Sequence, residues 1–245
     1  MKLCCDAMKT LTPEAIFFDL DDTLVAYDEV TVPTWRRVCT QFGGREGIPD
    51  AEPLYRIIRG TSEWYWSDPE RHRTGRQDLA SARRNILRLA FERHGLRNDR
   101  IAGAIADAYT VQRVEAMFLL EGVPETLETL RSRGIGLALV TNGDSEGQHA
   151  KIERFGLAGY FDAIFVEGDL GFGKPDPRVF NLALEALGAV PGLTWCVGDN
   201  LVWDVGGAQG VGIHGIWRDW RGNGLPADTS IIPDRIVRSV SELRQ

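Results

Sequence analysis

Short apolar runs recur along the chain and indicate buried strands. The first is Ala15-Ile16-Phe17-Phe18, and it predicts a strand over 15–20 that ends among three carboxylates. Apolar runs of about four to eight residues that stop at a turn signal are typical of strands buried on both faces of a sheet. Comparable runs predict further strands over 135–140, 163–166, 194–197, 213–217 and 236–237.

Helical spacing of apolar residues separates these later runs. Pro124 near the start and Gly134 after the end delimit one predicted helix, and Asp144 or Ser145 is the expected N-cap of the next. Strands that alternate with helices of this kind form crossover units in a parallel sheet. We therefore expect an α/β fold with a doubly wound, Rossmann-like core. The helices are predicted over 124–133, 144–155, 176–187 and 202–209.

Residues 28–118 differ from the rest of the chain because only helical spacing is evident there. The stretch 78–94 is the clearest case, since its apolar residues recur on one face and Gly95 follows its last turn. We expect an all-helical cap domain over 28–118, inserted into a core domain formed by 1–27 and 119–245. The four helices of this cap are predicted over 30–42, 51–66, 78–94 and 99–119.

Composition narrows the classes of protein that the chain can represent. The net charge of −7 argues against nucleic acid as the main partner, because duplex binding requires a basic face. No apolar stretch approaches the length of a membrane span. The N-terminal residues lack the apolar region of a signal peptide, so we expect a cytoplasmic protein. Reduced thiols are expected at the four cysteines, which lack metal-ligand spacing: Cys4, Cys5, Cys39 and Cys196.

Four short polar motifs follow successive predicted strands. Each motif is a weak signal alone, because such short patterns are common in turns. Their order places all four at the C-terminal edge of a parallel sheet, where such sheets bind ligands. The motifs are Asp19-x-Asp21-x-Thr23, Thr141-Asn142-Gly143, Lys174-Pro175 and Gly198-Asp199-Asn200-x-x-x-Asp204.

The residue types in these motifs suit phosphoryl transfer. The carboxylate of Asp19 can attack phosphorus and form an aspartyl-phosphate. An anion that attacks a phosphate dianion is repelled, so the site needs positive charge, which a hard cation such as Mg²⁺ supplies when carboxylate oxygens hold it. Asp19 and Asp199 are the natural side-chain ligands. Lys174 is a compact cation for the phosphate and for the charge of Asp19, and Asp204 is spaced to hold Lys174 or a water ligand in place.

Further groups complete this hypothesis. The hydroxyl of Thr141 and the backbone N–H groups of Asn142 and Gly143 can bind phosphate oxygens at the start of a helix. Asp21 is placed to protonate the leaving alkoxide and then to activate water against the aspartyl-phosphate. Substrate selection is expected in the cap, although most aromatic and arginine residues there should serve packing or solvation. The cap candidates are Trp64, Tyr65, Trp66, Arg56, Arg59, Arg71, Arg73 and Arg76.

Together the four motifs resemble those of the haloacid dehalogenase superfamily, and the helical insert stands where that family carries a C1-type cap. The resemblance implies that Asp19 is a nucleophile and Mg²⁺ ligand. It also implies that Asp21 is a general acid and base that binds Mg²⁺ through its main-chain carbonyl. Asp22 stands where many members have Gly, and subgroups with Asp exist. The remaining implied roles are phosphate binding by Thr141 and Asn142, charge stabilisation by Lys174, metal binding by Asp199, and support from Asp204, Thr23 and Asn200.

Asp21 separates the reactions of this superfamily. The dehalogenase branch needs no acid at that position, because a halide leaves without a proton. A carboxylate there, with a second acidic motif at 199–204, favours Mg²⁺-dependent hydrolysis of a small phosphorylated metabolite. A 2-haloacid dehalogenase and a non-catalytic binding protein are alternatives. The motifs also do not distinguish a phosphatase from a phosphomutase. The protein is expected to be a monomer or small homo-oligomer, with hinges near Tyr27 and Gly122 that let the cap close.

Overall fold

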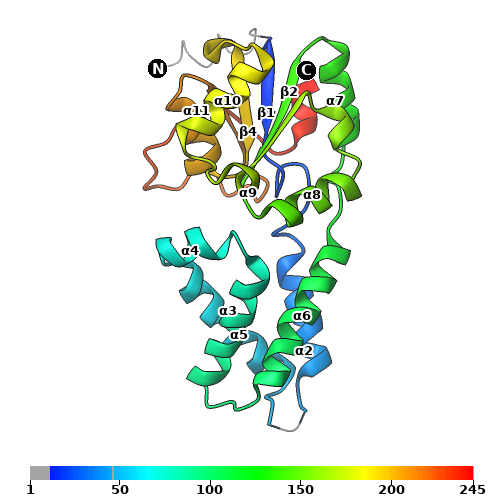
Figure 1. Ribbon diagram of the computed structural model, residues 1–245, viewed down its shortest axis with the longest axis vertical. Coiled ribbons are helices and arrows are strands. Elements are labelled where there is room, and N and C mark those ends of the chain that lie inside the picture. Colours follow the sequence, from blue (N-terminus) through cyan, green and yellow to red (C-terminus); the bar gives the residue numbers. More distant parts are fainter. Residues whose placement is uncertain (1–11, 46, 245) are drawn as a thin grey trace. The chain divides into compact units, whose positions relative to one another are not determined.

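The computed structural model describes residues 12–45 and 47–244 (Figure 1). These residues form two compact units. The core unit contains the described residues up to Ala26 together with those from Phe118 onward. The helical unit is Tyr27–Met117. Cys4 and Cys5 lie outside the described residues, whereas Cys39 and Cys196 are buried free thiols.

The core unit contains a six-stranded sheet in the order β3-β2-β1-β4-β5-β6, with every neighbouring pair parallel. This order is Rossmann-like, and it confirms the expected doubly wound α/β fold. In the register of the central strands, Phe18 lies opposite both Leu139 and Val197. The strands are β1 (Ala15–Phe18), β2 (Gly136–Thr141), β3 (Ala163–Val166), β4 (Thr194–Gly198), β5 (His214–Arg218) and β6 (Arg235–Val237).

Side chains of successive strand residues point to opposite faces of the sheet, and both faces are covered by other parts of the core unit. Phe17 and Val140 belong to one face and pack in a cluster with Phe180 and Ala183 of α10 (Pro177–Leu187). Successive strand residues point to opposite faces, so Phe18 belongs to the other face, where its ring meets Phe161 edge to face. Figure 1 shows α10 and α11 (Gly207–Gln209) on one side of the sheet and α7 (Val123–Ser132) on the other.

Apart from short 3₁₀ helices, two elements of the core unit differ from the sequence expectation. The single helix predicted over 202–209 is instead a π-helix over Leu201–Gly206 that continues into α11. Asn200 begins it by accepting hydrogen bonds from the next backbone N–H groups through its side chain. The short helix α9 (Glu167–Leu170) was not predicted. The predicted helix after β2 is α8 (Ser145–Arg154), and the side chain of Asp144 caps it by accepting from the Gly147 N–H at 2.6 Å.

The helical unit contains five helices within the described residues, one more than predicted. The additional helix is α4, which begins where Asp68 accepts a hydrogen bond from the Arg71 N–H at 2.8 Å and Pro69 occupies the first helical position. The predicted helix over 99–119 ends earlier, at Ala116. The helices are α2 (Thr31–Phe42), α3 (Ala51–Trp66), α4 (Pro69–Gly75), α5 (Leu79–Arg93) and α6 (Asp99–Ala116).

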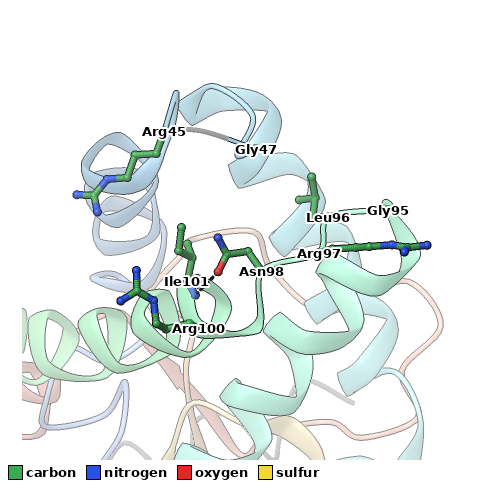
Figure 2. Close-up of a pocket in the computed structure, with 8 residues that line it drawn as sticks. All are labelled: Arg45, Gly47, Gly95, Leu96, Arg97, Asn98, Arg100 and Ile101. Atoms are coloured by element: carbon green, nitrogen blue, oxygen red, sulfur yellow. Dashed lines mark hydrogen bonds between the residues drawn. The ribbon is translucent and has the colours of Figure 1, made fainter.

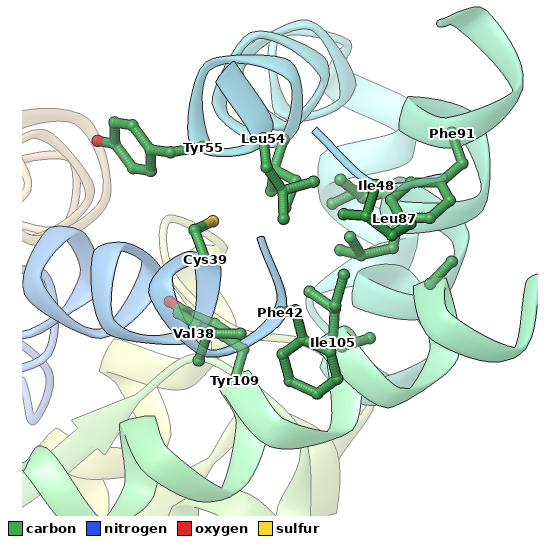
Figure 3. Packing of buried hydrophobic residues seen from close by; sticks show 14 of the residues in the cluster. Val38, Cys39, Phe42, Ile48, Leu54, Tyr55, Leu87, Phe91, Ile105 and Tyr109 are labelled. Atoms are coloured by element: carbon green, nitrogen blue, oxygen red, sulfur yellow. The ribbon is translucent and has the colours of Figure 1, made fainter. Parts of the chain in front are cut away.

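The helical unit has a hydrophobic core of its own. Figure 3 shows Phe42, Leu54, Leu87 and Ile105 converging from four different segments. The ring of Tyr109 packs in the same cluster and stacks on Trp35 with a centroid separation of 3.7 Å. Because this cluster belongs entirely to Tyr27–Met117, the unit can bury apolar surface without using the sheet.

Two paired segments lead from the core unit to the helical unit. Val25 and Leu119 form an antiparallel bridge, and the Ala26 N–H donates to the Phe118 carbonyl at 2.9 Å. Gly122, the expected second hinge, lies beyond this junction inside the core unit, where it has a φ of 78° and precedes α7. In the described ranges, no helix combines the length and apolar character needed to cross a membrane.

Candidate active site

The predicted site residues gather at the C-terminal edge of the three adjacent strands β2, β1 and β4. Asp19 follows β1 directly, Asn142 follows β2, and Asp199 follows β4. In this strand order the chain switches direction around β1, and parallel sheets place their ligand crevice at such a point. Three segments that are distant in sequence therefore contribute side chains to one place.

Lys174 bridges two of the predicted carboxylates. Its Nζ lies 2.7 Å from Asp19 Oδ1 and 2.6 Å from Asp204 Oδ1, and its side chain is only 2% exposed. The other oxygen of Asp204 accepts from the Asn200 N–H at 2.9 Å. Gly198 makes this close packing possible, because a Cβ there would lie 2.2 Å from the Asp204 carboxylate. Lys174 thus holds Asp19 and Asp204 in fixed positions.

The carboxylates suit a divalent cation. One oxygen from each of Asp19, Asp199 and Asp204 lies within 4.8 Å of the others. Asp204 is already engaged by Lys174 and by the Asn200 N–H, so Asp19 and Asp199 are the better-placed ligands. Hard oxygen donors of this kind are those that Mg²⁺ prefers.

Burial also makes these carboxylates unfavourable as bare anions. Desolvation, together with the neighbouring charges of Asp19 and Asp204, raises the pKa of Asp199 to about 9. Desolvation outweighs the opposing effect of the Lys174 ammonium, so the pKa of Asp19 is raised to about 7. A bound cation would favour the ionised forms of both groups, because an opposite charge stabilises a carboxylate.

Two residues of β5 fix the backbone of the acidic loops. The indole N–H of Trp217 donates to the Asp199 carbonyl at 2.7 Å, and the guanidinium of Arg218 donates to the Asp22 carbonyl. Asp22 has a left-handed φ of 56°, a conformation that Gly and Asp tolerate better than most residues. An aspartate therefore suits the backbone of this loop. Neither β5 contact was predicted, because no local spacing marks it.

The carboxylate of Asp21 has partners that the sequence did not suggest. Lys151 Nζ lies 2.7 Å from Asp21 Oδ1 and 2.5 Å from Oδ2. Gln148 Nε2 lies 3.2 Å from Asp21 Oδ2. Both partners come from α8, and their spacing of three residues places them on the same face of that helix. That spacing, in the helix that follows Thr141-Asn142-Gly143, is the sequence signal that could have pointed to them.

The Thr-Asn-Gly turn is tied to its surroundings by side-chain hydrogen bonds. Thr141 Oγ1 accepts from Gln148 Nε2 at 2.8 Å. The side-chain amide of Asn142 accepts from the Lys174 N–H at 2.8 Å and donates to its carbonyl at 2.7 Å. The Gly143 N–H donates to Glu167 Oε2 at 3.1 Å. Asn142 therefore supports Lys174, and a phosphate would have to displace Glu167 to reach the Gly143 N–H.

Several cap candidates have structural partners within the helical unit. Trp64 is stacked against the guanidinium groups of Arg71 and Arg93, at 4.0 and 3.6 Å from its ring centroid. Arg59 and Arg73 form ion pairs with nearby glutamates. Tyr65 is buried in the core of the unit. Packing and surface pairing account for these positions.

A surface pocket of about 720 Å³ lies in the helical unit, and none of the predicted site residues lines it. It is formed by residues beside Arg45 and by the turn between α5 and α6. Figure 2 shows that the side chains of Arg45, Arg97 and Arg100 point in different directions. They do not converge on one anion, so this pocket does not replace the acidic site.

Comparison with known proteins agrees with the fold. The haloacid dehalogenase-like hydrolase family matches residues 13–212, and the chain belongs to this family. The phosphoserine phosphatase of Thermus thermophilus is 33% identical over 252 residues, which cover 93% of this chain and 96% of the relative. The ribulose-1,5-bisphosphate 5-phosphatase of Halopiger xanaduensis is 32% identical over 238 residues, covering 93% and 91%.

A solved structure supports the fold. A HAD-hydrolase from Bacillus subtilis, solved bound to magnesium, has a TM-score of 0.71 and 23% identity, and the match covers 94% of this chain and 96% of that one. At this identity the likeness concerns the fold alone. The family match and the two phosphatases above confirm the prediction of an enzyme of the phosphoric monoester hydrolase class.

Proposed function

We propose that the protein is a Mg²⁺-dependent phosphatase of small phosphomonoesters that works through a phosphorylated Asp19. The arrangement around Asp19 carries this proposal: Lys174 holds one carboxylate oxygen at 2.7 Å, and Thr23 Oγ1 lies 3.4 Å from the other. Mg²⁺ held by Asp19, Asp199 and the main-chain carbonyl of Asp21 would supply the charge that offsets repulsion between nucleophile and phosphate.

The first half-reaction uses two carboxylates. An oxygen of Asp19 attacks phosphorus, the ester P–O bond breaks, and the leaving oxygen takes a proton from Asp21. Lys174 keeps the nucleophile in place and lowers the cost of negative charge at the reacting centre. Thr141 and the backbone of Asn142 are the proposed phosphate contacts, since both lie at the end of β2 beside β1.

The second half-reaction regenerates the enzyme. Asp21 removes a proton from water, the resulting hydroxide attacks phosphorus, and the bond between phosphorus and Asp19 breaks to release inorganic phosphate. A dehalogenase would have no need of the proton that Asp21 supplies. The presence of a carboxyl group at position 21 therefore favours ester hydrolysis.

The substrate class is a small phosphorylated metabolite. Its support is the family of named phosphatases, since one acts on phosphoserine and another on ribulose-1,5-bisphosphate. Both of these substrates are compact phosphomonoesters that carry a second anionic group. A panel of such esters is the direct way to find the preferred one.

The test measures phosphate release from 4-nitrophenyl phosphate with Mg²⁺, with EDTA, and for Asp19→Asn. We expect Mg²⁺-dependent turnover in the wild type and a loss of several orders of magnitude in Asp19→Asn, because the variant lacks the nucleophile. Asp228→Asn removes an exposed carboxylate of the core unit and should leave the rate unchanged. Turnover that ignores Mg²⁺, or survives in Asp19→Asn, would contradict the proposal. Chloride release from a 2-haloacid would instead favour the dehalogenase.

A further inference from the structure

Lysine is rare in this chain, and the two lysines in the described residues both contact site carboxylates. Of 28 basic residues only four are lysines, and two of those precede residue 12. Lys174 contacts Asp19 and Asp204, whereas Lys151 contacts Asp21. Each of the two carboxylates with a proposed part in bond making or proton transfer therefore has its own ammonium group. Lysine places a compact point charge, unlike the planar fork of arginine.

We propose that Lys151, assisted by Gln148, is a positioning residue that orients the Asp21 carboxylate for proton transfer to the leaving group. This inference rests on the proposed phosphatase function and extends it to residues outside the four motifs. Lys151 has no proposed bond to the substrate. It acts through Asp21, whose orientation decides how efficiently the leaving oxygen is protonated.

The contacts on the two oxygens of Asp21 are unequal. Oδ2 accepts from both Lys151 and Gln148, at 2.5 and 3.2 Å, whereas Oδ1 accepts from Lys151 alone at 2.7 Å. Each carboxylate oxygen offers about two acceptor positions. The Gln148 amide has two N–H groups for three nearby acceptors, and Asp21 Oδ2 is the most distant of these. Lys151, which contacts both oxygens, is therefore the main partner that sets the orientation of the carboxylate.

The contacts that Lys151 and Gln148 make with Asp21 depend on α8 and on the turn before it. Asp144 fixes the start of the helix, and the Lys151 side chain is 11% exposed, so it is held by its surroundings. Gly143 has a φ of 132°, and a Cβ there would lie 3.0 Å from Gln148 Nε2. The glycine of the Thr-Asn-Gly motif therefore leaves the space in which Gln148 reaches Asp21.

Gln148 also links the proton-transfer group to the proposed phosphate contacts. The same Nε2 atom that contacts Asp21 lies 2.8 Å from Thr141 Oγ1 and also donates to the Asn142 carbonyl. One amide group thus touches the ends of both β1 and β2. A shift of Gln148 would disturb Asp21 and Thr141 together, whereas a shift of Lys151 acts on Asp21 alone, so Lys151 is the cleaner position to test.

The experiment compares two leaving groups of similar shape. Phenyl phosphate releases a far more basic oxygen than 4-nitrophenyl phosphate, so it depends more on protonation by Asp21. For Lys151→Met we expect kcat/KM to fall by about 10²-fold with phenyl phosphate and by less than about tenfold with 4-nitrophenyl phosphate, in the range of general acid catalysis. Lys151→Arg keeps the charge and should recover part of the loss. Arg154→Met removes an exposed cation from the same helix and should change neither rate.

A double variant identifies the route of the effect. Asp21→Asn should show the same dependence on leaving group, and Asp21→Asn with Lys151→Met should be no slower than Asp21→Asn alone. Thermal denaturation of each variant checks that it is folded. Equal losses on both esters, an effect confined to KM, or additive losses in the double variant would each overturn the proposal. Absence of Mg²⁺-dependent turnover in the wild type would instead overturn the phosphatase function itself.

Discussion

Asp199 shows how one buried carboxylate couples protonation to metal binding. Lys174 contacts Asp19 and Asp204, while Asp199 lies within reach of both acids and has its carbonyl held by Trp217. Burial raises its pKa to about 9, so the metal-free folded protein holds a proton there at neutral pH. A cation would displace that proton on binding.

The pH dependence of stability should reveal this proton. Between pH 4 and 9 the folded state binds a proton at Asp199 that the unfolded state has already released. The free energy of unfolding of the metal-free protein should therefore fall with rising pH, by up to about 1.4 kcal/mol per pH unit from this group. Urea unfolding of the wild type and of Asp199→Asn across this range isolates the term as a difference between the two curves.

Two controls sharpen that measurement. Saturating Mg²⁺ should remove most of the pH dependence of the wild-type stability near pH 8, since the ionised carboxylate is then the bound form. Asp228→Asn should run parallel to the wild type at every pH, because this residue is exposed. Parallel curves for Asp199→Asn would show that Asp199 is ionised in the folded protein without metal.

The local motifs of the sequence predicted residues that the structure brings together in the candidate site, whereas contacts that depend on tertiary placement were not predicted. Asp19, Asp199 and Lys174 each stand next to a strand end or a turn, so their convergence follows from a parallel sheet. Lys151 and Trp217 do not belong to any local motif that predicts a place in the site. Lys151 reaches Asp21 only because α8 packs beside the end of β1, and neither the orientation nor the register of that helix could be deduced from spacing.

At the scale of elements, β5 acts as a brace for the acidic edge. Trp217 and Arg218 are successive residues, so their side chains leave opposite faces of the strand. Their donors nevertheless reach the carbonyls of two different loops, at Asp199 and Asp22. Thus β5 provides no carboxylate itself, but its side chains fix the distance between the two loops that contain Asp22 and Asp199.

Removing one of these contacts should weaken metal binding. Trp217→Phe keeps an aromatic ring in β5 but loses the N–H that holds the Asp199 carbonyl, so the loop should fix its ligand less well. We expect the apparent Kd for Mg²⁺ to rise by about tenfold, as for other groups that support metal ligands. The rise in melting temperature as a function of Mg²⁺ concentration measures it. Trp220→Phe is the matched control, and equal Mg²⁺ midpoints for the two variants would exclude the bracing role.

The apolar runs predicted every strand of the sheet, and the signal is clearest for the central strands, because strands buried on both faces are almost continuously hydrophobic. The elements that were missed are short or irregular. The helix α4 spans only Pro69–Gly75, although Asp68-Pro69 marked its start. The π-helix over Leu201–Gly206 depends on Asn200, whose side chain caps it while its carbonyl accepts from Asp204 and Val205. Residue spacing does not distinguish that pattern from an ordinary helix.

For the whole molecule, the important fact is that two hydrophobic cores are separate. The sequence pattern alternates between strands and helices outside residues 28–118 and is only helical within them, which predicted two domains. The structure contains two compact units. One core lies against the sheet, and the other is enclosed by the helices of the helical unit. The acidic site described above uses residues of the core unit only.

This separation predicts independent responses to ligand and mutation. Mg²⁺ should slow amide exchange in the core unit, whereas Leu87→Ala should speed it in the helical unit, with a loss of about 2–5 kcal/mol in local stability. Hydrogen exchange followed by mass spectrometry resolves the two units. Val111→Ala, an exposed position on α6, is the control. Equal changes in both units for either perturbation would show that they unfold as one.

The paired segments at Val25 and Leu119 have a consequence for how such a chain can diversify. The Ala26 N–H donates to the Phe118 carbonyl at 2.9 Å, so the two backbone connections to the helical unit are hydrogen-bonded to each other. A short hairpin turn could connect Ala26 to Phe118 in place of the whole insert, since these two residues already pair like residues of adjacent strands. We therefore expect that the helical unit can be shortened, replaced or recombined while β1 and β4, which lead into Asp19 and Asp199, keep their register.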